Sequence, residues 1–453
     1  MKMISRFLAY FLIGGVLLSA CAPISPAAPS PVMHSIYAPI VSGAPAQAQG
    51  LRIGIVVFLT GEAAEPFGLP ARDGAQAMID SLNSGQAPAP YDTPGIGGVP
   101  IVPVYVDESG GAEQQVAELR RLFEEEQVDL VIGYISSGDC MAVAPVAEEM
   151  QKLTIAFDCG TSRLFEERDY RYVFRTNAHQ AIDSLGGARY LLHQMPDLQT
   201  IAGINQNYSW GQDSWAHFRE TIHRLRPEVQ VVGAQFPKLY AGDYDAEIAA
   251  LRAANPQVVH TSFWGGDLEV FVRQASSARL FDFSTVLMSV GESGLPMLAE
   301  RIPAGTIIGA HGPHGVMAPD SELNTWLVGL YSERYGTLPT YPVYHMAQAL
   351  LGIKMAYENA AAAQGHWPAL EDVITAFEYL EYPTPSGVIS LSIGSGHQAV
   401  EPAVYGTVGA YDPDTGRVQI EDIVIYPAAC VTPPQGVTTE QWIREGFPGA
   451  ECP

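Results

Sequence analysis

Positively charged residues are scarce in this chain. It carries 24 Lys and Arg residues against 49 Asp and Glu residues, which gives a formal net charge of −25 at pH 7. An acidic surface of this kind repels nucleic acid and anionic membrane surfaces. Because no basic stripe along the chain reverses the charge, we expect no nucleic-acid partner.

The motifs of common catalytic sites are also missing. The sequence has no G-x-S-x-G, no H-E-x-x-H, no P-loop and no G-x-G-x-x-G after a strand. It has no C-x-x-C for redox chemistry, and no set of Cys and His has the spacing of metal ligands. The nearest metal pair is His311 and His314, for which a hinge role or surface exposure is expected. A hydrolase using Ser137 would need a histidine base that the sequence does not place. We therefore expect no enzyme, no cofactor and no metal.

Long apolar runs are confined to the N-terminus. Lys2 and Arg6 precede an apolar run at residues 7–18, which is too short for a comfortable membrane span. The Leu-Ser-Ala-Cys that follows resembles a bacterial lipobox. We expect a lipoprotein signal peptide at 1–21 with lipidation at Cys21, and an ordinary secretory signal is the alternative. Residues 22–50 are rich in Ala, Pro and Ser and are expected to form a flexible tether.

Cysteine is rare, with five residues in the chain. Beyond Cys21 there are Cys140, Cys159, Cys430 and Cys452. Four cysteines in an exported protein suggest two disulfides, for which three connectivities exist. Cys140 and Cys159 fall at the ends of neighbouring strand loops, so we favour their pairing. Cys430 and Cys452 would then close the Pro- and Gly-rich tail.

The rest of the chain has the composition of a globular protein, with 47% hydrophobic residues overall. Strand and helix patterns alternate in two successive series, which predicts an α/β fold with doubly wound parallel sheets. Predicted strands of the first series are 52–59, 101–106, 128–133 and 154–157. Those of the second are 200–205, 229–236, 258–263, 285–290 and 306–310. Helices at 321–335, 344–363 and 370–380 and strands at 388–392 and 418–426 complete the series.

Residues 128–162 form the centre of the predicted site. Two short apolar strands there each end in a small polar loop, and the carboxyl ends of such strands are where open α/β sheets bind ligands. Ser136, Ser137, Thr161 and Ser162 supply hydroxyl groups, and a helix from about Cys140 supplies free backbone N–H groups. A small carboxylate suits this corner, although Ser137 or Asp139 alone would more simply cap the helix.

With its elements in this order, the chain resembles the branched-chain amino acid (Leu/Ile/Val) type of periplasmic solute-binding protein, a type I binding protein of ABC importers. The local signatures are Ile-Gly-Ile at 53–55, Phe-Gly at 67–68, Ile-Gly with Ser-Ser at 132–137, and Ala-Val-Ala-Pro-Val at 142–146. The resemblance covers residues 51 to about 426. It implies two lobes joined by a three-segment hinge, with lobe 1 at 51–175 and 315–385 and lobe 2 at 176–314 and 386–453.

The resemblance also implies a set of binding residues in the cleft between the lobes. Ser137 with neighbouring Ser136 and Thr161 would bind the ligand carboxylate, and the backbone of Cys159 and Gly160 would face its ammonium. Glu292 would be the acidic partner of that ammonium. Trp210 stands where the family usually has Tyr, which changes the pocket. The side-chain pocket would be lined by Phe67, Phe263 and Trp264. Asp267 is expected to cap a helix and Tyr208 to cover the surface of its lobe.

These features predict an exported, membrane-anchored lipoprotein facing the periplasm or cell exterior. It would bind a small amino acid or similar carboxylate and deliver it to the permease subunits of an ABC importer. The main alternative is a sensor or receptor ectodomain of the same fold, and an amide, urea or aromatic acid is the alternative ligand. An exported enzyme ranks behind both.

Overall fold

The computed structural model describes residues 50–453 of the chain. The predicted signal peptide, Cys21 and all of the predicted tether except Gly50 lie outside the described residues. Across residues 50–453, no helix combines the length and the apolar character that a membrane span requires.

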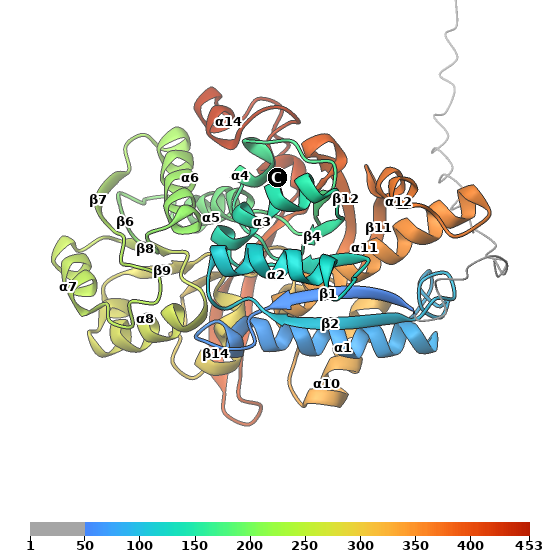
Figure 1. Cartoon of the computed structure of the whole chain (residues 1–453). Helices are drawn as coiled ribbons and strands as arrows, with labels where there is room; N and C mark the ends of the chain where they lie inside the picture. The colour runs from blue at the N-terminus through green and yellow to red at the C-terminus, as the bar shows by residue number, and fades with distance from the viewer. Residues whose placement is uncertain (1–49) are drawn as a thin grey trace, which may run out of the picture. The chain divides into compact units, whose positions relative to one another are not determined.

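The first sheet has eight strands in the order β11-β12-β13-β5-β4-β3-β1-β2 (Figure 1). The strands from β13 to β2 pair in parallel, whereas β11, β12 and β13 pair antiparallel with one another. The strands are β1 Leu51–Val57, β2 Ile101–Asp107, β3 Leu130–Gly133, β4 Thr154–Ala156, β5 Val173–Arg175, β11 Glu381–Thr384, β12 Gly387–Ile393 and β13 Gln398–Val400.

The second sheet has seven strands in the order β15-β14-β10-β9-β8-β6-β7. Strands β10 to β7 are parallel, and β14 runs antiparallel to both β10 and β15. The strands are β6 Thr200–Ile204, β7 Gln230–Gln235, β8 Val258–Thr261, β9 Thr285–Met288, β10 Ile307–Gly309, β14 Ala403–Asp412 and β15 Arg417–Tyr426.

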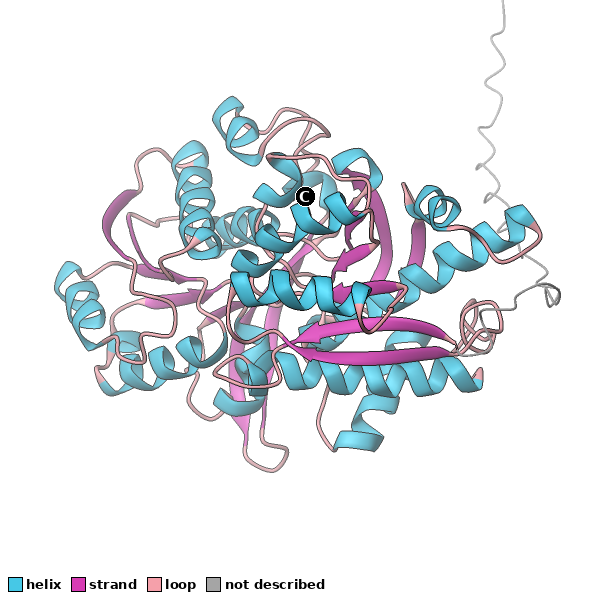
Figure 2. Ribbon diagram, in the orientation of Figure 1, coloured by secondary structure: helices cyan, strands magenta, loops and turns pink. Residues whose placement is uncertain are grey.

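Helices cover both faces of each sheet (Figure 2). The first sheet lies between α1 and α11 on one face and α2 and α3 on the other. The second lies between α5 and α6 on one face and α7 and α8 on the other. The helices of four or more residues are α1 Leu69–Ser84, α2 Ala112–Glu124, α3 Ser137–Met150, α4 Arg163–Glu166, α5 Gln180–Gln194, α6 Ser209–Leu225, α7 Asp245–Ala254, α8 Gly265–Ser277, α9 Leu295–Leu298, α10 Glu322–Tyr335, α11 Tyr341–Gln364, α12 Leu370–Phe377, α13 Ala428–Val431 and α14 Thr439–Glu445, with one π-helical turn, η2 Ala64–Gly68, before α1.

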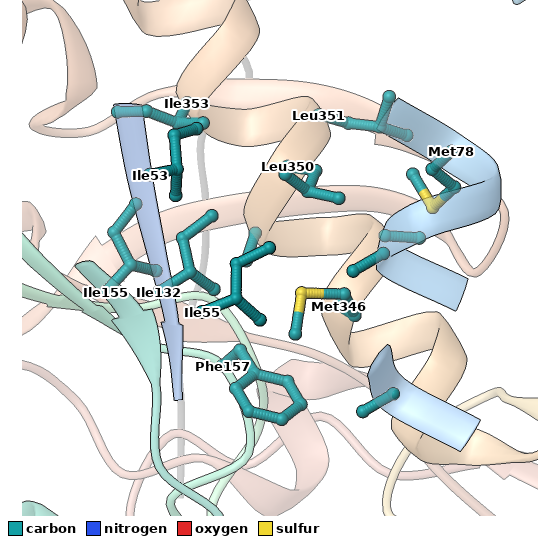
Figure 3. Close-up of a cluster of buried hydrophobic side chains, with 14 of the residues drawn as sticks. Ile53, Ile55, Met78, Ile132, Ile155, Phe157, Met346, Leu350, Leu351 and Ile353 are labelled. Carbon is teal, nitrogen blue, oxygen red and sulfur yellow. The ribbon is translucent and has the colours of Figure 1, made fainter. Parts of the chain in front are cut away.

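The core of the first lobe shows why its strands are apolar on both faces. Ile53 and Ile55 of β1 point toward α11, where they pack with Ile132, Ile155 and the apolar side of that helix (Figure 3). Val56, which alternates with them, belongs to the cluster formed with α2 and α3. Burial on both faces explains the continuous apolar runs of these strands. It also brings their carboxyl ends, and the loops that follow, to one edge of the sheet.

The chain passes between the two sheets three times, after β5, after β10 and after β13. The predicted arrangement of two lobes with a three-segment hinge is therefore observed. The expected return to the second lobe at residue 386 is wrong, because β12 and β13 still belong to the first sheet. The return lies between Val400 and Ala403, at the start of β14.

Several elements differ from the sequence-based expectations. The strand pattern did not identify β11, β13 or β14, so both sheets are mixed where purely parallel sheets were expected. In β14, Gly406 interrupts the strand pattern. A Cβ atom at this position would lie 2.3 Å from Cγ2 of Ile420 in the facing strand β15, so there is no room for a side chain. The helix expected from about Cys140 begins at Ser137. The Phe-Gly pair at 67–68 ends the π-helical turn, and α1 begins directly after it at Leu69.

Both predicted disulfides are present. Cys140 is bonded to Cys159 and Cys430 is bonded to Cys452. The tail after Tyr426 forms α13 and α14, which pack on α5 and α6 of the second lobe through Trp442 and Ile443. The tail is thus an integral layer of that lobe.

Candidate functional site

A cavity lies where loops from the two sheets meet. It is bordered by Phe67, Ile135, Ser137, Asp158, Gly160, Tyr208, Trp210, Trp264, His311 and Tyr341. Most of these residues follow the carboxyl ends of parallel strands, β1, β3 and β4 in the first sheet and β6, β8 and β10 in the second, whereas Tyr341 begins α11. The cavity volume is about 20 Å³, which is room for a water molecule. Entry of an amino-acid-sized solute therefore requires the lobes or their side chains to move apart.

The sequence-based site residues divide into two groups. Those that border the cavity are Phe67, Ser137, Gly160, Trp210 and Trp264. Those that lie behind its wall are Ser136, Cys159, Thr161, Phe263 and Glu292. Contact between any of them and a solute stays a prediction. Asp158, Tyr208, His311 and Tyr341 border the cavity and were not predicted as site residues.

Ser136 and Ser137 have different positions at the start of α3. Ser136 is the N-cap, and its Oγ accepts a hydrogen bond from the backbone N–H of Asp139 at 3.4 Å. Capping is therefore performed by Ser136 rather than by Ser137 or Asp139. Ser137 is the first residue of the helix and borders the cavity. The N–H groups of Ser137 and Gly138 have no acceptor within the helix, so they are available to an anion.

Glu108, which was not predicted as a site residue, supports the Ser136–Ser137 corner through hydrogen bonds. Its buried carboxylate accepts hydrogen bonds from the backbone N–H of Ile135, at 2.8 Å, and of Ser136, at 2.7 Å. Burial, together with the nearby Asp139 carboxylate, raises the pKa of Glu108 well above its usual value. A signal existed in the sequence, since Glu108 directly follows an apolar strand, at the edge where the other loops were placed.

The loop after β4 is held by the predicted disulfide and by hydrogen bonds that were not expected. The Cys140–Cys159 disulfide ties it to α3. The carbonyl of Cys159 accepts a hydrogen bond from Nη1 of Arg175 at 2.8 Å, and that of Gly160 accepts one from the N–H of Gln180 at 2.7 Å. These two carbonyls, expected to face a ligand ammonium, thus already have protein donors. Burial lowers the pKa of Arg175 to about 9.

Aromatic rings form most of the cavity wall. The indole N–H of Trp210 donates to the carbonyl of Ser262 and that of Trp264 donates to the hydroxyl of Tyr208, both at 2.8 Å. Since both N–H groups have partners, the two tryptophans present ring surface to the cavity. Phe67 packs edge-on against Trp264, with 5.3 Å between ring centroids. Tyr208 is therefore part of this wall and does not cover the lobe surface as expected.

Gly160 and Trp210 meet across the cavity. A Cβ atom on Gly160 would lie 2.1 Å from Cζ3 of the Trp210 ring. Only glycine allows the loop of the first lobe to approach the tryptophan of the second this closely.

Two residues considered in the sequence analysis have structural partners away from the cavity. Phe263 packs in the core of the second lobe against Tyr244 and Phe271. Asp267 does not cap α8, since its carboxylate accepts from Gln206 at 2.8 Å and from the N–H of Tyr240 at 3.0 Å.

Glu292 is fully enclosed behind Tyr341. Its carboxylate accepts a hydrogen bond from the N–H of Tyr341 at 3.0 Å, and a Cβ atom on Gly315 would lie 1.7 Å from its Oε1. Burial raises the pKa of this carboxyl to about 7. In this conformation Glu292 positions Tyr341, which itself borders the cavity.

Buried histidines and carboxylates gather at the floor of the cavity. His311 and His314 are not exposed on the surface, and His345 of α11 packs against both rings. Asp158, His311 and His345 each offer one ligand atom, and these atoms lie within 4.8 Å of one another. This is the group of side chains, among those described, that has the geometry to hold a metal ion. His314 instead contacts Ser386 at 2.6 Å and Glu401 at 3.3 Å.

The chain was compared with known proteins. A family model described as periplasmic binding protein matches residues 50–412. A Leu/Ile/Val-binding protein homolog 4 from Brucella melitensis biotype 1 is 28% identical over 214 residues, which are 44% of this chain and 47% of that protein. The chain thus matches about half the length of its curated relatives.

Solved structures show the same fold. A solute-binding protein of an ABC transporter from Rhodopseudomonas palustris BisB5, in complex with 3,4-dihydroxybenzoic acid, has a TM-score of 0.71 at 17% identity, covering 83% of this chain and 97% of that one. Leucine-binding protein LivK from Thermotoga maritima MSB8 has a TM-score of 0.66 at 17% identity, covering 83% and 98%. These likenesses show the two-lobed type I architecture. The members of the matched family are binding proteins rather than enzymes. Because the family model matches most of the chain, this protein belongs to the periplasmic binding protein family.

Proposed function

We propose that this protein is the extracytoplasmic solute-binding lipoprotein of an ABC importer. It binds a small amino acid or an amino-acid-like carboxylate between its lobes and delivers it to a permease. The observation that carries the proposal is the position of Ser137 at the cavity, on the first turn of α3. A hydroxyl beside free helix N–H groups is suited to a carboxylate.

The aromatic wall favours a second class of solute. Phe67, Tyr208, Trp210, Trp264 and Tyr341 all border the cavity. Flat rings stack well in such surroundings, so an aromatic carboxylate is the alternative ligand. Similar structures were solved with 3,4-dihydroxybenzoate, benzoate and 4-hydroxybenzoate bound, which supports the same alternative.

Solute binding is tested by thermal shift and calorimetry. A solute that binds the folded protein raises its melting temperature. The screen contains the free amino acids, small aliphatic carboxylates and hydroxylated benzoates. Absence of any saturable response from all three sets contradicts the proposal, and a response to the benzoates alone selects the aromatic alternative.

The role of Ser137 is tested by Ser137→Ala. Loss of a hydrogen bond to a charged group costs about 1.5–3 kcal/mol, so affinity is expected to fall at least about tenfold. Ser332→Ala, in α10 of the first lobe, is the matched control and should bind normally. Equal affinities for the two variants would remove Ser137 from the site.

Membrane anchoring and delivery need separate measurements. Labelling with a radioactive fatty acid should mark the wild type and not Cys21→Ala. Uptake of the identified solute should fall in cells that lack this protein and return when it is supplied. Normal uptake without it would contradict import and favour a sensing role.

A further inference from the structure

We propose that Asp158, His311 and His345 bind a divalent transition-metal ion of the zinc class at the floor of the cavity. The three side chains come from the loop after β4, from the crossing after β10 and from α11. All three are buried, and their ligand atoms lie within 4.8 Å of one another. Two imidazoles and one carboxylate form a donor set that such ions accept.

The hydrogen bonds of His311 fix which ring nitrogen is free. Its Nδ1 is in contact with Oδ2 of Asp183, so Nδ1 carries the hydrogen and donates it to that carboxylate. Nε2 then keeps its lone pair. Its nearest polar neighbour is the amide nitrogen of Asn177, at a long 3.4 Å.

The contacts of His345 allow the same arrangement at its other nitrogen. Nδ1 lies 2.6 Å from Oδ1 of Asp158, so without a metal ion an N–H at this position donates to the carboxylate. A metal ion bound by His345 Nδ1 and Asp158 would displace that hydrogen. Nε2, which lies 3.2 Å from the carbonyl oxygen of His311, would then carry the hydrogen and donate it there.

Asp158 supplies an independent sign of a missing partner. Its Oδ2 is buried and has no hydrogen-bond partner within residues 50–453. A buried carboxylate oxygen without a partner destabilises the folded state, and a bound cation would supply that partner. Asp158 is also one of the residues that border the cavity.

The surroundings match what metal sites require of their histidines. Ligating imidazoles nearly always donate their second N–H to a carboxylate or a backbone carbonyl. Here His311 Nδ1 contacts the Asp183 carboxylate, and His345 Nε2 has the carbonyl of His311 as an acceptor when Nδ1 binds the ion. Three protein ligands leave at least one coordination position vacant. Since Asp158 and His311 border the cavity, that position faces the solute, whose carboxylate can complete the coordination. This last step rests on the proposed function, whereas the metal site itself does not.

The test is a metal titration of the full chain after removal of metals with a chelator. Calorimetry with ZnCl₂ should show one ion bound per chain. Co²⁺ should give the ligand-field absorption of a low-coordinate nitrogen and oxygen site. Asp158→Asn and His345→Gln should each weaken Zn²⁺ binding at least about tenfold. His260→Gln is the matched control, because His260 is equally buried and bonds Ser289 in the second lobe, outside the cluster.

Folding of each variant is checked by circular dichroism. If a ligand variant does not fold, Asp183→Asn decides, since it removes only the second partner of His311. It should weaken Zn²⁺ binding by about 10- to 100-fold and keep the Co²⁺ spectrum. No saturable Zn²⁺ binding by the wild type overturns the proposal. So does equal binding by wild type, Asp158→Asn and His345→Gln, which would locate the ion on other side chains.

Repeating the solute screen on metal-stripped protein separates the two proposals. Solute binding without any Zn²⁺ binding overturns the metal site alone. Zn²⁺ binding that depends on Asp158, with no solute response in either form, overturns the proposed function alone.

Discussion

Arg163 of α4 and Asp213 of α6 form a two-point ion pair between the lobes. Nε and Nη2 of Arg163 lie 2.7 and 2.5 Å from the two carboxylate oxygens of Asp213. Beside this pair, Glu166 of α4 accepts hydrogen bonds from the N–H and hydroxyl of Thr439 in the tail. One short helix of the first lobe therefore binds the second lobe at two points. Both contacts stabilise the closed arrangement seen here.

Removing the ion pair should favour the open arrangement. Asp213→Asn is expected to weaken solute affinity by about fivefold, since a partly exposed pair contributes up to about 1 kcal/mol. The loss should shrink at high salt because exposed charges are screened. Calorimetry at low and high salt measures both effects. Glu220→Gln, on the same helix but paired only with neighbouring Arg219, is the control. Unchanged affinity in Asp213→Asn would show that the pair does not influence closure.

The two disulfides allow a matched comparison, because their partners are 19 and 22 residues apart. Replacing either pair with Ser should cost roughly 3 kcal/mol of unfolding free energy. Only the Cys140/Cys159 variant should lose solute affinity as well, since that bond joins the start of α3 to the loop carrying Gly160. Urea unfolding and calorimetry test the two statements. Equal affinity losses in both variants would contradict a local role for Cys140–Cys159.

Gly160→Ala tests whether the approach of the two lobes matters for binding. The added methyl group would overlap the ring of Trp210. Because Gly160 and Trp210 belong to different lobes, separation of the lobes would remove this overlap. We expect weaker solute binding, by about tenfold or more, with little change in melting temperature without solute. Gly329→Ala, in α10, is the control because nothing lies within 4 Å of its new Cβ. A large loss of stability without solute would indicate that Gly160 is needed for folding instead.

Glu292 should make stability depend on pH. Burial raises the pKa of its carboxyl from 4.5 to about 7 in the folded protein. The folded state therefore holds the proton more tightly than the unfolded state. The contribution of proton binding to the unfolding free energy is complete below pH 4.5 and is lost as the pH rises to 7. The loss approaches about 3 kcal/mol.

The comparison is made with Glu292→Gln, which cannot ionise at this position. The variant should match the wild type at pH 5 and exceed its unfolding free energy by up to about 3 kcal/mol at pH 8. Urea unfolding at both pH values gives the difference. Exposed Glu300→Gln should follow the wild type throughout. A wild-type advantage that grows with pH would contradict the raised pKa.

Glu108→Gln tests the support beneath the Ser136–Ser137 corner. Oε1 of Glu108 accepts from both backbone N–H groups, and Oε2 accepts a second bond from Ile135 at 2.9 Å. In Gln the amide nitrogen replaces one of these oxygens, so a donor would face the N–H of Ile135. We expect a loss of about 1–3 kcal/mol in unfolding free energy, together with weaker solute binding. Glu124→Gln, an exposed acid in α2, should change neither. Full stability in Glu108→Gln would show that the corner does not depend on this carboxylate.

The parts of the molecule that sequence predicts well are those governed by local pattern. Strands such as β3 and β8 are short apolar runs ended by polar loops, so the strands themselves and the edge that carries Ser137 and Gly160 follow directly. The hairpin of β14 and β15 follows less clearly, because Gly406 and Gly409 interrupt its alternation and are explained only by the facing strand.

Residues that act through distant partners are the ones that pattern does not identify. Asp158 and His345 are 187 positions apart, and only the third dimension brings them to 2.6 Å. His311 and His314 suggest a pair because they are close in sequence, yet His311 contacts Asp183 and His314 contacts Ser386. Glu108 follows β2, whereas its N–H donors follow β3, and β1 lies between these two strands. The sequence does not specify this strand order.

The order of strands has a consequence for how the protein is made and exported. Until residues 398–400 arrive, β5 is an edge of the first sheet, and until residues 403–412 arrive, β10 is an edge of the second. A chain still emerging from the ribosome or the export channel thus exposes two open strand edges, which are templates for aggregation. Neither lobe can complete its sheet before about nine-tenths of the polypeptide has appeared. Chaperones that hold the nascent chain unfolded would therefore protect both lobes from aggregation.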